Sequence, residues 1–146
     1  MKVLLLFLLP FLMIKGCSEK DNNVTTDIKV VYTASTRGFF QKITIQNHQV
    51  SVSKDRKEEG IGTSAKISEA DWNELVQLYS KLDLEKIKTY EAPTQKRLFD
   101  GAPTANMSIT EKDTTYETTT FDHKSPPVEM AAFVNKVVAL AEKKVD

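Results

Sequence analysis

The stretch "FFQKITIQNHQVSVS", residues 39–53, decides the fold class because its apolar residues recur at every second position. The residues expected on the buried face are Phe39, Ile43, Ile45, Val50 and Val52. Alternation of this kind is typical of antiparallel strands with one buried and one solvated face. Asn47 separates the two halves and tolerates a positive φ angle, so the sequence predicts a tight hairpin there.

Segments on both sides of this hairpin complete an α+β domain. Residues 28–34 and 104–111 alternate in the same way, and residues 114–121 are rich in β-favouring residues, which gives a sheet of about five strands. One amphipathic helix is expected to start at the N-cap Ser68, and another at Ser125, just before two prolines. The predicted fold is therefore an antiparallel sheet in the chain order β-β-β-α-β-β-α, with both helices packed on one face.

The N-terminal region has a different composition. An apolar run of 12 residues extends from Val3 to Ile14, whereas spanning a bilayer takes about 20 residues. The run fits a secretory signal peptide. Ile14-Lys15-Gly16-Cys17 resembles the lipobox of bacterial lipoproteins, and this resemblance implies cleavage before Cys17 and a lipid on its sulfur. An uncleaved signal anchor, or an ordinary signal with a chance cysteine, stays open as the alternative.

This interpretation divides the chain into three parts. They are a lipoprotein signal peptide at 1–16, a lipidated cysteine with a polar tether at 17–26, and a single α+β domain at 27–146. Each buried CH₂ of an acyl chain contributes about 0.8 kcal/mol, so two or three chains give durable anchoring. By analogy with lipoprotein sorting, Ser18 favours the outer membrane. The predicted location is the cell envelope, with the protein held to the membrane through its lipid.

Charge and cysteine content narrow the function classes. Lys and Arg number 20, as do Asp and Glu, so the chain has no excess positive charge that would attract nucleic acid. Cys17 is the only cysteine, which excludes an internal disulfide and a multi-thiolate metal site. The two histidines are far apart in sequence, and no glycine-rich phosphate loop is present. We therefore expect no cofactor, no metal and no nucleic-acid partner.

Three strings carry a resemblance to a known family. They are "ISEADWNELVQLYSKLDLEKI" at 67–87, "RLFDGAPTANMSI" at 97–109 and "TTFDHKSPP" at 119–127. Together with "ITI" they resemble an exported bacterial domain family that has no established activity, over about 120 residues of this chain. Related domains often carry a cysteine pair where this chain has "RGFFQK" at 37–42, so the resemblance implies that a redox role at this place is absent.

Two aspartates are the candidate catalytic residues. Asp100 and Asp122 each follow a phenylalanine at the edge of a predicted strand. With His123 and Arg97 nearby, two carboxylates would suit general acid–base chemistry or a hard cation. The alternative is structural: the aspartates make turn and capping bonds while the preceding phenylalanines fill the core.

Candidate binding residues are Arg37, Phe40 and Arg97. Arg37 and Phe40 offer an aromatic and cationic patch for a partner or a glycan, although Phe40 packed under a neighbouring loop is the alternative. Residues 55–66, residues 91–103 and the polar face of the sheet offer further surface.

The leading hypothesis is a non-enzymatic, lipid-anchored module that binds an envelope protein or a glycan. One alternative is a small hydrolase or cation-dependent enzyme using Asp100, Asp122 and His123. The other is an inhibitor that blocks another enzyme with the hairpin at Asn47 or the loop at Arg97.

Overall fold

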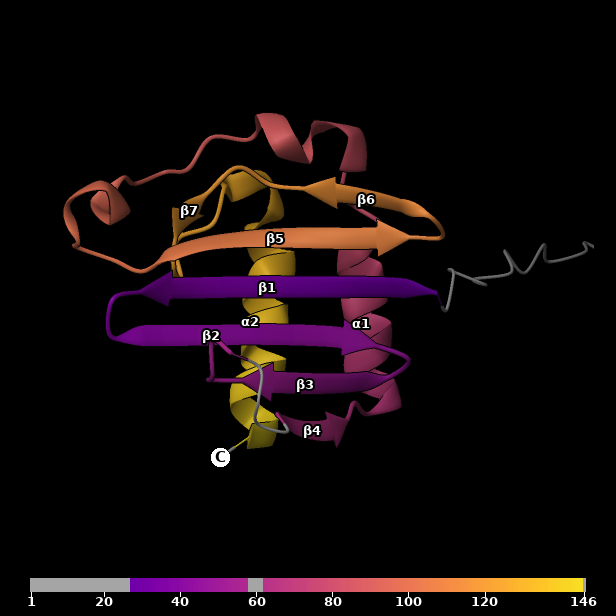
Figure 1. Ribbon diagram of the computed structural model, residues 1–146. Helices are drawn as coiled ribbons and strands as arrows, with labels where there is room; N and C mark the ends of the chain where they lie inside the picture. Colours follow the sequence, from indigo (N-terminus) through magenta and orange to yellow (C-terminus); the bar gives the residue numbers. More distant parts are fainter. Residues whose placement is uncertain (1–26, 58–61, 146) are drawn as a thin grey trace, which may run out of the picture.

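The computed structural model describes residues 27–57 and 62–145. The predicted signal peptide and tether, with the proposed lipidation site Cys17, lie outside the described residues. Within them the chain forms an α+β domain built on one antiparallel sheet, in the order β4-β3-β2-β1-β5-β6, with β7 paired to β5 (Figure 1). The strands are β1 (Ile28–Thr36), β2 (Phe39–Gln46), β3 (Gln49–Ser53), β4 (Thr63–Lys66), β5 (Thr104–Glu111), β6 (Thr114–Glu117) and β7 (Phe121–Asp122).

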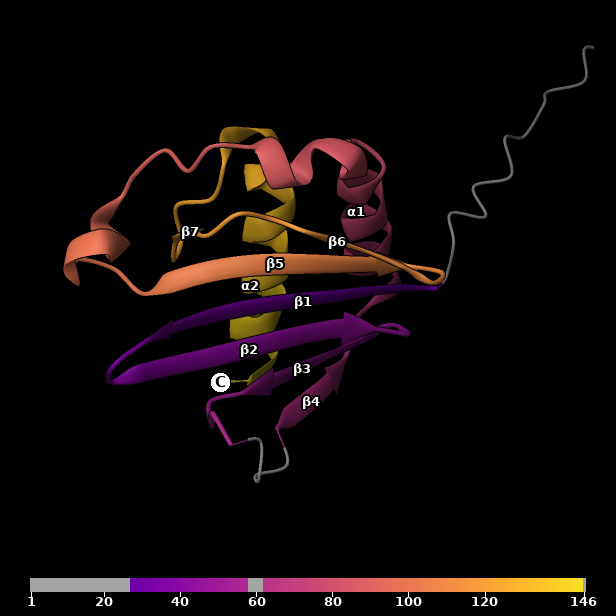
Figure 2. The same ribbon diagram turned by 45° about the horizontal axis from the view of Figure 1, so that its top comes forward.

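Two α-helices and three short 3₁₀ helices complete the described part. The α-helices are α1 (Glu69–Tyr79) and α2 (Ala131–Val145), and the 3₁₀ helices are η1 (Leu84–Thr89), η2 (Lys96–Phe99) and η3 (Val128–Met130). Figures 1 and 2 show α1 and α2 together on one face of the sheet, as expected. No helix in the described residues is long and apolar enough to cross a membrane.

The hydrophobic core lies between this face and the two helices. Tyr32 of β1 pairs with Ile43 of β2 and with Met107 of β5, and all three are fully buried. The buried cluster draws its members from residues between Ile28 and Ala141. A fragment of residues 27–146 therefore contains a complete core, and such a domain is expected to fold alone.

The opposite face of the sheet is polar. Its side chains are half-buried to exposed, and no helix of the described chain lies over them in either view (Figures 1 and 2). Thr110 and Thr115 hydrogen-bond across β5 and β6 at 2.9 Å on this face. Other members are Thr33, Ser35, Lys42, Thr44, Gln46, Ser51, Ser53, Asn106 and Ser108.

The described sheet contains seven strands rather than about five. We expected residues 57–66 to be a loop, but residues 63–66 pair with β3 as an edge strand whose side chains are mostly exposed. An edge strand of this kind carries no apolar alternation to reveal it. The expected strand 114–121 divides in two, because the Thr118 hydroxyl takes the place of a backbone acceptor and binds the N–H of Met107 at 3.0 Å.

The two predicted helix starts have different outcomes. Ser68 is the N-cap of α1, and its Oγ accepts the N–H of Asp71 at 3.2 Å, which confirms the prediction. Ser125 is not a cap, and that prediction was wrong. It bridges to Asp122 instead, because the two prolines that follow keep the chain extended until η3 begins at Val128.

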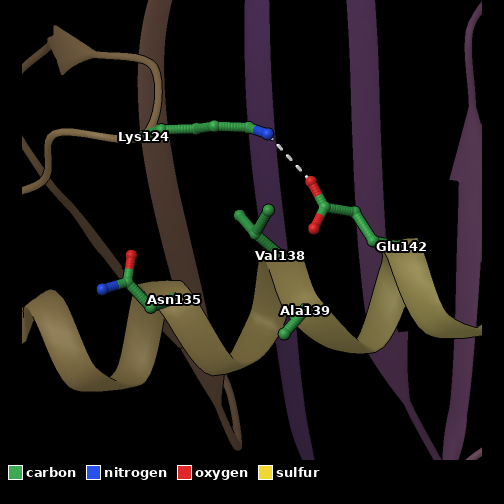
Figure 3. A pocket seen from close by; sticks show the side chains of 5 residues that line it. All are labelled: Lys124, Asn135, Val138, Ala139 and Glu142. Atoms are coloured by element: carbon green, nitrogen blue, oxygen red, sulfur yellow. Dashed lines mark hydrogen bonds and ion pairs between the residues drawn. The ribbon is translucent and has the colours of Figure 1, made fainter.

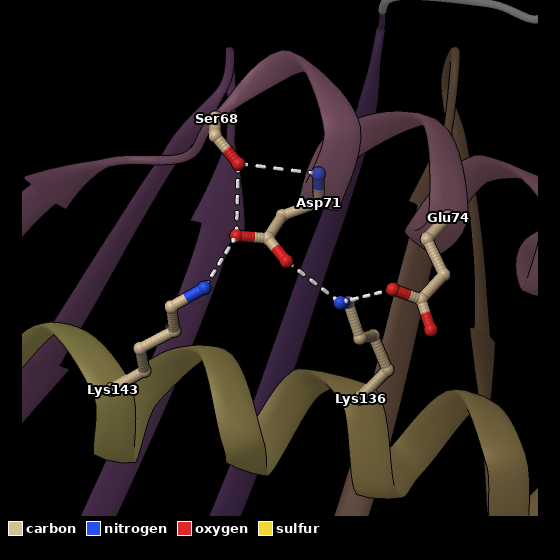
Figure 4. A network of polar contacts seen from close by, with 5 residues as sticks. All are labelled: Ser68, Asp71, Glu74, Lys136 and Lys143. Carbon is tan, nitrogen blue, oxygen red and sulfur yellow. Dashed lines mark hydrogen bonds and ion pairs between the residues drawn. The ribbon is translucent and has the colours of Figure 1, made fainter.

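Ion pairs join the two helices (Figure 4). Lys136 of α2 donates to Asp71 at 2.9 Å and also to Glu74, while Lys143 donates to Asp71 at 3.2 Å. Hydrogen bonds from Lys136, Ser68 and Lys143 hold the pKa of Asp71 well below its usual range. These contacts fix α1 against α2 above the core.

Candidate functional site

Asp122 is a buried carboxylate with 1% of its surface exposed. Its Oδ2 accepts hydrogen bonds from Thr94 Oγ1 at 2.6 Å and from the backbone N–H of Lys96 at 2.7 Å. Its Oδ1 accepts the backbone N–H of Arg97 at 3.0 Å and Nη1 of the same arginine at 3.1 Å. A carboxylate offers about four lone-pair sites, so these four donors saturate it.

The Asp122–Arg97 ion pair holds residues 94–97 against β7. Burial by itself raises the pKa of Asp122, but the bonds from Thr94, from the Arg97 and Lys96 backbone and from the Arg97 side chain outweigh it and hold the pKa well below its usual range. Arg97 Nη1 also donates to the Thr94 carbonyl at 2.8 Å. Arg97 Nε is buried and has no hydrogen-bond partner within the described residues.

Asp100 has a different environment. It ends η2 in the left-handed conformation, with φ at 57°, and it is exposed. The four donors to Asp122 come from residues 94–97, so Asp122 stabilises this turn, while Asp100 is the residue at which η2 ends. In the part of the chain that the structure describes, no group of three or more His, Cys, Asp or Glu residues could hold a metal ion.

His123 lies among aromatic rings. Its Nδ1 is 2.7 Å from the Tyr32 hydroxyl, and its ring centroid is 5.3 Å from that of Phe39. This one hydrogen bond engages both the Tyr32 hydroxyl and Nδ1. Burial, and then the Lys124 charge, lower the pKa of His123. Burial also raises the pKa of Tyr32 to about 12, so both groups are neutral at pH 7.

Leu98 and Phe99 project from η2 into solvent, and we call this pair the apolar tip. They are 67% and 74% exposed. The sequence interpretation that placed both phenylalanines in the core was wrong for Phe99 and right for Phe121, which is fully buried. The reason is that Asp122 holds Arg97, the residue just before the tip, while the chain turns outward.

The apolar tip and the β1–β2 hairpin lie at the same end of the sheet (Figures 1 and 2). Phe39, which was expected in the core, is 37% exposed at the start of β2. Its ring contacts His123, whose neighbour Asp122 holds η2. A chain of contacts therefore connects the hairpin to the tip.

The candidate binding residues Arg37 and Phe40 line a depression of about 330 Å³ at this end. It lies between residues 37–40 of the hairpin and residues 54–57 after β3, and we call it the basic depression. The Arg56 guanidinium carbon is 5.8 Å from the centroid of the Phe40 ring. Arg37 is exposed and Phe40 is half-buried.

A second depression of about 190 Å³ lies along α2 (Figure 3). Lys124 and Glu142 form an ion pair of 2.9 Å across it, and Val138 and Ala139 line it. Its two charges already neutralise each other, so it offers less to a charged ligand than the basic depression does.

Sequence reasoning missed four residues at the end of the sheet that carries the apolar tip and the basic depression. It also missed one ring contact elsewhere. The missed residues are Thr94, Arg56, Leu98 and Phe99. The signal for the tip was two adjacent apolar residues inside an otherwise irregular polar stretch, 91–103. The ring contact is that of His48 in the β2–β3 turn, whose centroid lies 4.1 Å from that of Trp72.

Comparison with known proteins finds no matching family model and no matching curated protein. The function of the chain is therefore argued from its own geometry.

Proposed function

We propose that this protein is a lipid-anchored, non-enzymatic binding module of the cell envelope, and that its apolar tip is the centre of the contact with a partner protein. The anchor is the lipid on Cys17 that the lipobox resemblance implies. The observation that carries the proposal is the exposure of Leu98 and Phe99, at 67% and 74%, on a turn held by a saturated buried carboxylate.

Exposed apolar side chains are costly unless a partner covers them. Single exposed apolar residues are common on protein surfaces, whereas contiguous exposed apolar patches mark interaction sites, and Leu98 and Phe99 are adjacent and both exposed. Aromatic anchors of this kind contribute most of the binding energy in many interfaces. Asp122 fixes the backbone that carries them, which lowers the entropy lost on binding.

The position of the tip suits an external partner. The described chain enters β1 at Ile28, which pairs with Glu111 at one end of the sheet, whereas the hairpin and the tip lie at the other end (Figure 1). A strand of nine residues is about 30 Å long. The tip therefore faces away from the proposed point of attachment.

Two observations weigh against the enzymatic alternative. Both oxygens of Asp122 are taken by four donors, and a general base needs a free lone pair within reach of a substrate proton. The His123 Nδ1 is occupied by Tyr32. One observation also supports the inhibitor alternative. An inhibitor that blocks another enzyme's cleft needs a rigid projecting turn, and the turn that carries Leu98 and Phe99 has this form.

Site-specific photo-crosslinking in the producing cells tests the proposal. The variant Phe99→p-benzoylphenylalanine should give one discrete crosslinked protein. The same analogue at Val128, which is 80% exposed and begins η3, is the matched control and should not. Equal and diffuse crosslinking from both positions would refute a contact at the tip. Identification of the crosslinked protein as an enzyme, inhibited on binding, would favour the inhibitor.

A further inference from the structure

The basic depression has an unbalanced charge. Among the described residues, its lining includes four bases, Arg37, Lys54, Arg56 and Lys57, against one acid, Asp55. The Asp55 Oδ1 accepts the backbone N–H of Lys57 at 3.0 Å, so this carboxylate is already used in a turn. The described lining therefore presents an excess of positive charge to a ligand that enters the depression, and carboxylates are the complementary groups.

Contacts within the domain hold Arg56 in place. Its Nη2 donates to the carbonyl of Thr36 and to that of Phe39, the latter at 3.4 Å, and its guanidinium lies over the Phe40 ring. The planar guanidinium is suited to carboxylates, and its two carbonyl acceptors and the Phe40 ring restrict its orientation. Because Arg56 is exposed, solvent can reach it, and so can an acidic side chain.

The depression and the apolar tip belong to one end of the molecule. Phe39 lines the depression, contacts His123, and is linked through Asp122 to η2. Figure 2 shows the β1–β2 hairpin and the segment just before β5 at the same end of the sheet. A protein that covers Leu98 and Phe99 therefore brings its periphery toward the depression. Protein interfaces combine an apolar centre with a polar, partly hydrated rim, and this pairing has that arrangement.

We propose that the basic depression is the charged rim of the contact surface and that the partner is a protein carrying a cluster of Asp and Glu side chains beside an apolar socket. This inference rests on the proposed function and adds the chemistry of the partner. An acidic polysaccharide would bind in the depression alone. A protein partner would contact both the depression and the apolar tip.

Charge reversal tests the rim in cells. The double variant R37E/K57E, combined with the crosslinking analogue at position 99, should lower the crosslink yield about tenfold, since each exposed pair contributes a few-fold. The control K81E/K88E makes the same change of charge at exposed lysines after α1 and in η1. It should leave the yield within about twofold of the unaltered protein.

A titration of the 27–146 fragment tests the ligand class directly. A glutamate hexapeptide should shift the amide signals of residues 37–40 and 54–57 at low salt, and the shifts should vanish at about 1 M salt, where the Debye length is about 3 Å. R37E/K57E should abolish them, and L98S/F99S should not. Oligogalacturonate of equal charge is the glycan probe and should bind more weakly.

The outcomes separate this inference from the proposed function. Crosslinking from position 99 that R37E/K57E does not change would overturn the charged rim and leave the binding module intact. Tighter binding of oligogalacturonate than of the hexapeptide would overturn the protein ligand. No specific crosslink from position 99, with the hexapeptide still bound, would refute the proposed function while supporting the acidic ligand.

Discussion

Replacing Asp122 by Asn should destabilise the domain strongly. The substitution keeps the shape of the side chain but puts an NH₂ group where one oxygen now accepts two hydrogen bonds. It also leaves the Arg97 guanidinium, whose side chain is 12% exposed, without its counter-charge. Breaking a buried ion pair by removing one partner costs about 3–5 kcal/mol. Because small domains are stable by about 5–15 kcal/mol, this is a large fraction of the total.

The assay is urea unfolding of the 27–146 fragment, followed by the fluorescence of Trp72, the only tryptophan. Asp122→Asn should lower the free energy of unfolding by about 3–5 kcal/mol, and at about 4 °C per kcal/mol the melting temperature should fall by about 12–20 °C. If that variant does not fold, Thr94→Ala removes one bond to the carboxylate and should cost about 1.5–3 kcal/mol.

A double-mutant cycle isolates the ion pair. Arg97→Met together with Asp122→Asn should cost less than the two single changes added together, because no unpaired buried charge then remains. A cost below about 1 kcal/mol for Asp122→Asn, or strict additivity of the two substitutions, would show that the Asp122–Arg97 ion pair does not stabilise the domain as argued.

The pH dependence of the Asp122 contribution has a defined sign. The folded-state pKa lies below the unfolded value of about 3.9, so the folded protein binds fewer protons near that pH. The stability difference between the parent fragment and Asp122→Asn should be constant above about pH 5 and should shrink below about pH 4.

Three further predictions concern other parts of the chain. Ser68→Ala should lower the free energy of unfolding by about 1 kcal/mol through loss of the α1 cap, and Ser68→Thr should restore most of it in the same urea assay. The lowered pKa of His123 means that stability should fall as pH drops below about 6.5; His123→Gln should flatten this part of the profile, and an unchanged profile would contradict the assignment. Cys17→Ser should move the processed protein from the membrane fraction to the aqueous one, and identical partitioning would remove the lipid anchor from the proposal.

The alternating strands were predictable from sequence because their side chains report burial directly. Ile28, Ile43 and Val52 each belong to a strand that alternates with period two, and each occupies the buried face that the pattern predicted. Ser68 was predictable because a cap acts within one turn of its own helix. β4 was not predictable, because an exposed edge strand is specified by the neighbouring strand that it pairs with. β7 was not predictable either, because two residues are too few to show a pattern.

The candidate site was predictable in its parts and not in its arrangement. Asp122 and Arg97 were singled out as chemical groups, but their 25-residue separation hides the fact that they bind each other. Nothing local indicates that the carboxylate also accepts the Lys96 and Arg97 backbone N–H groups. Phe99 and Phe121 have similar sequence surroundings and opposite exposures, because only the folded chain determines which one turns outward.

The central position of β1 has a mechanical consequence. β1 lies between β2 and β5 and pairs with both along nearly its whole length, from Ile28 to Thr36. Tension between the proposed membrane attachment before Ile28 and the proposed partner at the apolar tip would run roughly along this strand. The ladder hydrogen bonds are perpendicular to the strand, so tension loads the two flanking ladders in shear, all bonds together, rather than opening them one by one. The strand that would carry the load is therefore one that pairs on both sides along nearly its whole length. The domain should stay folded under a pulling force that acts between its N-terminal end and the apolar tip.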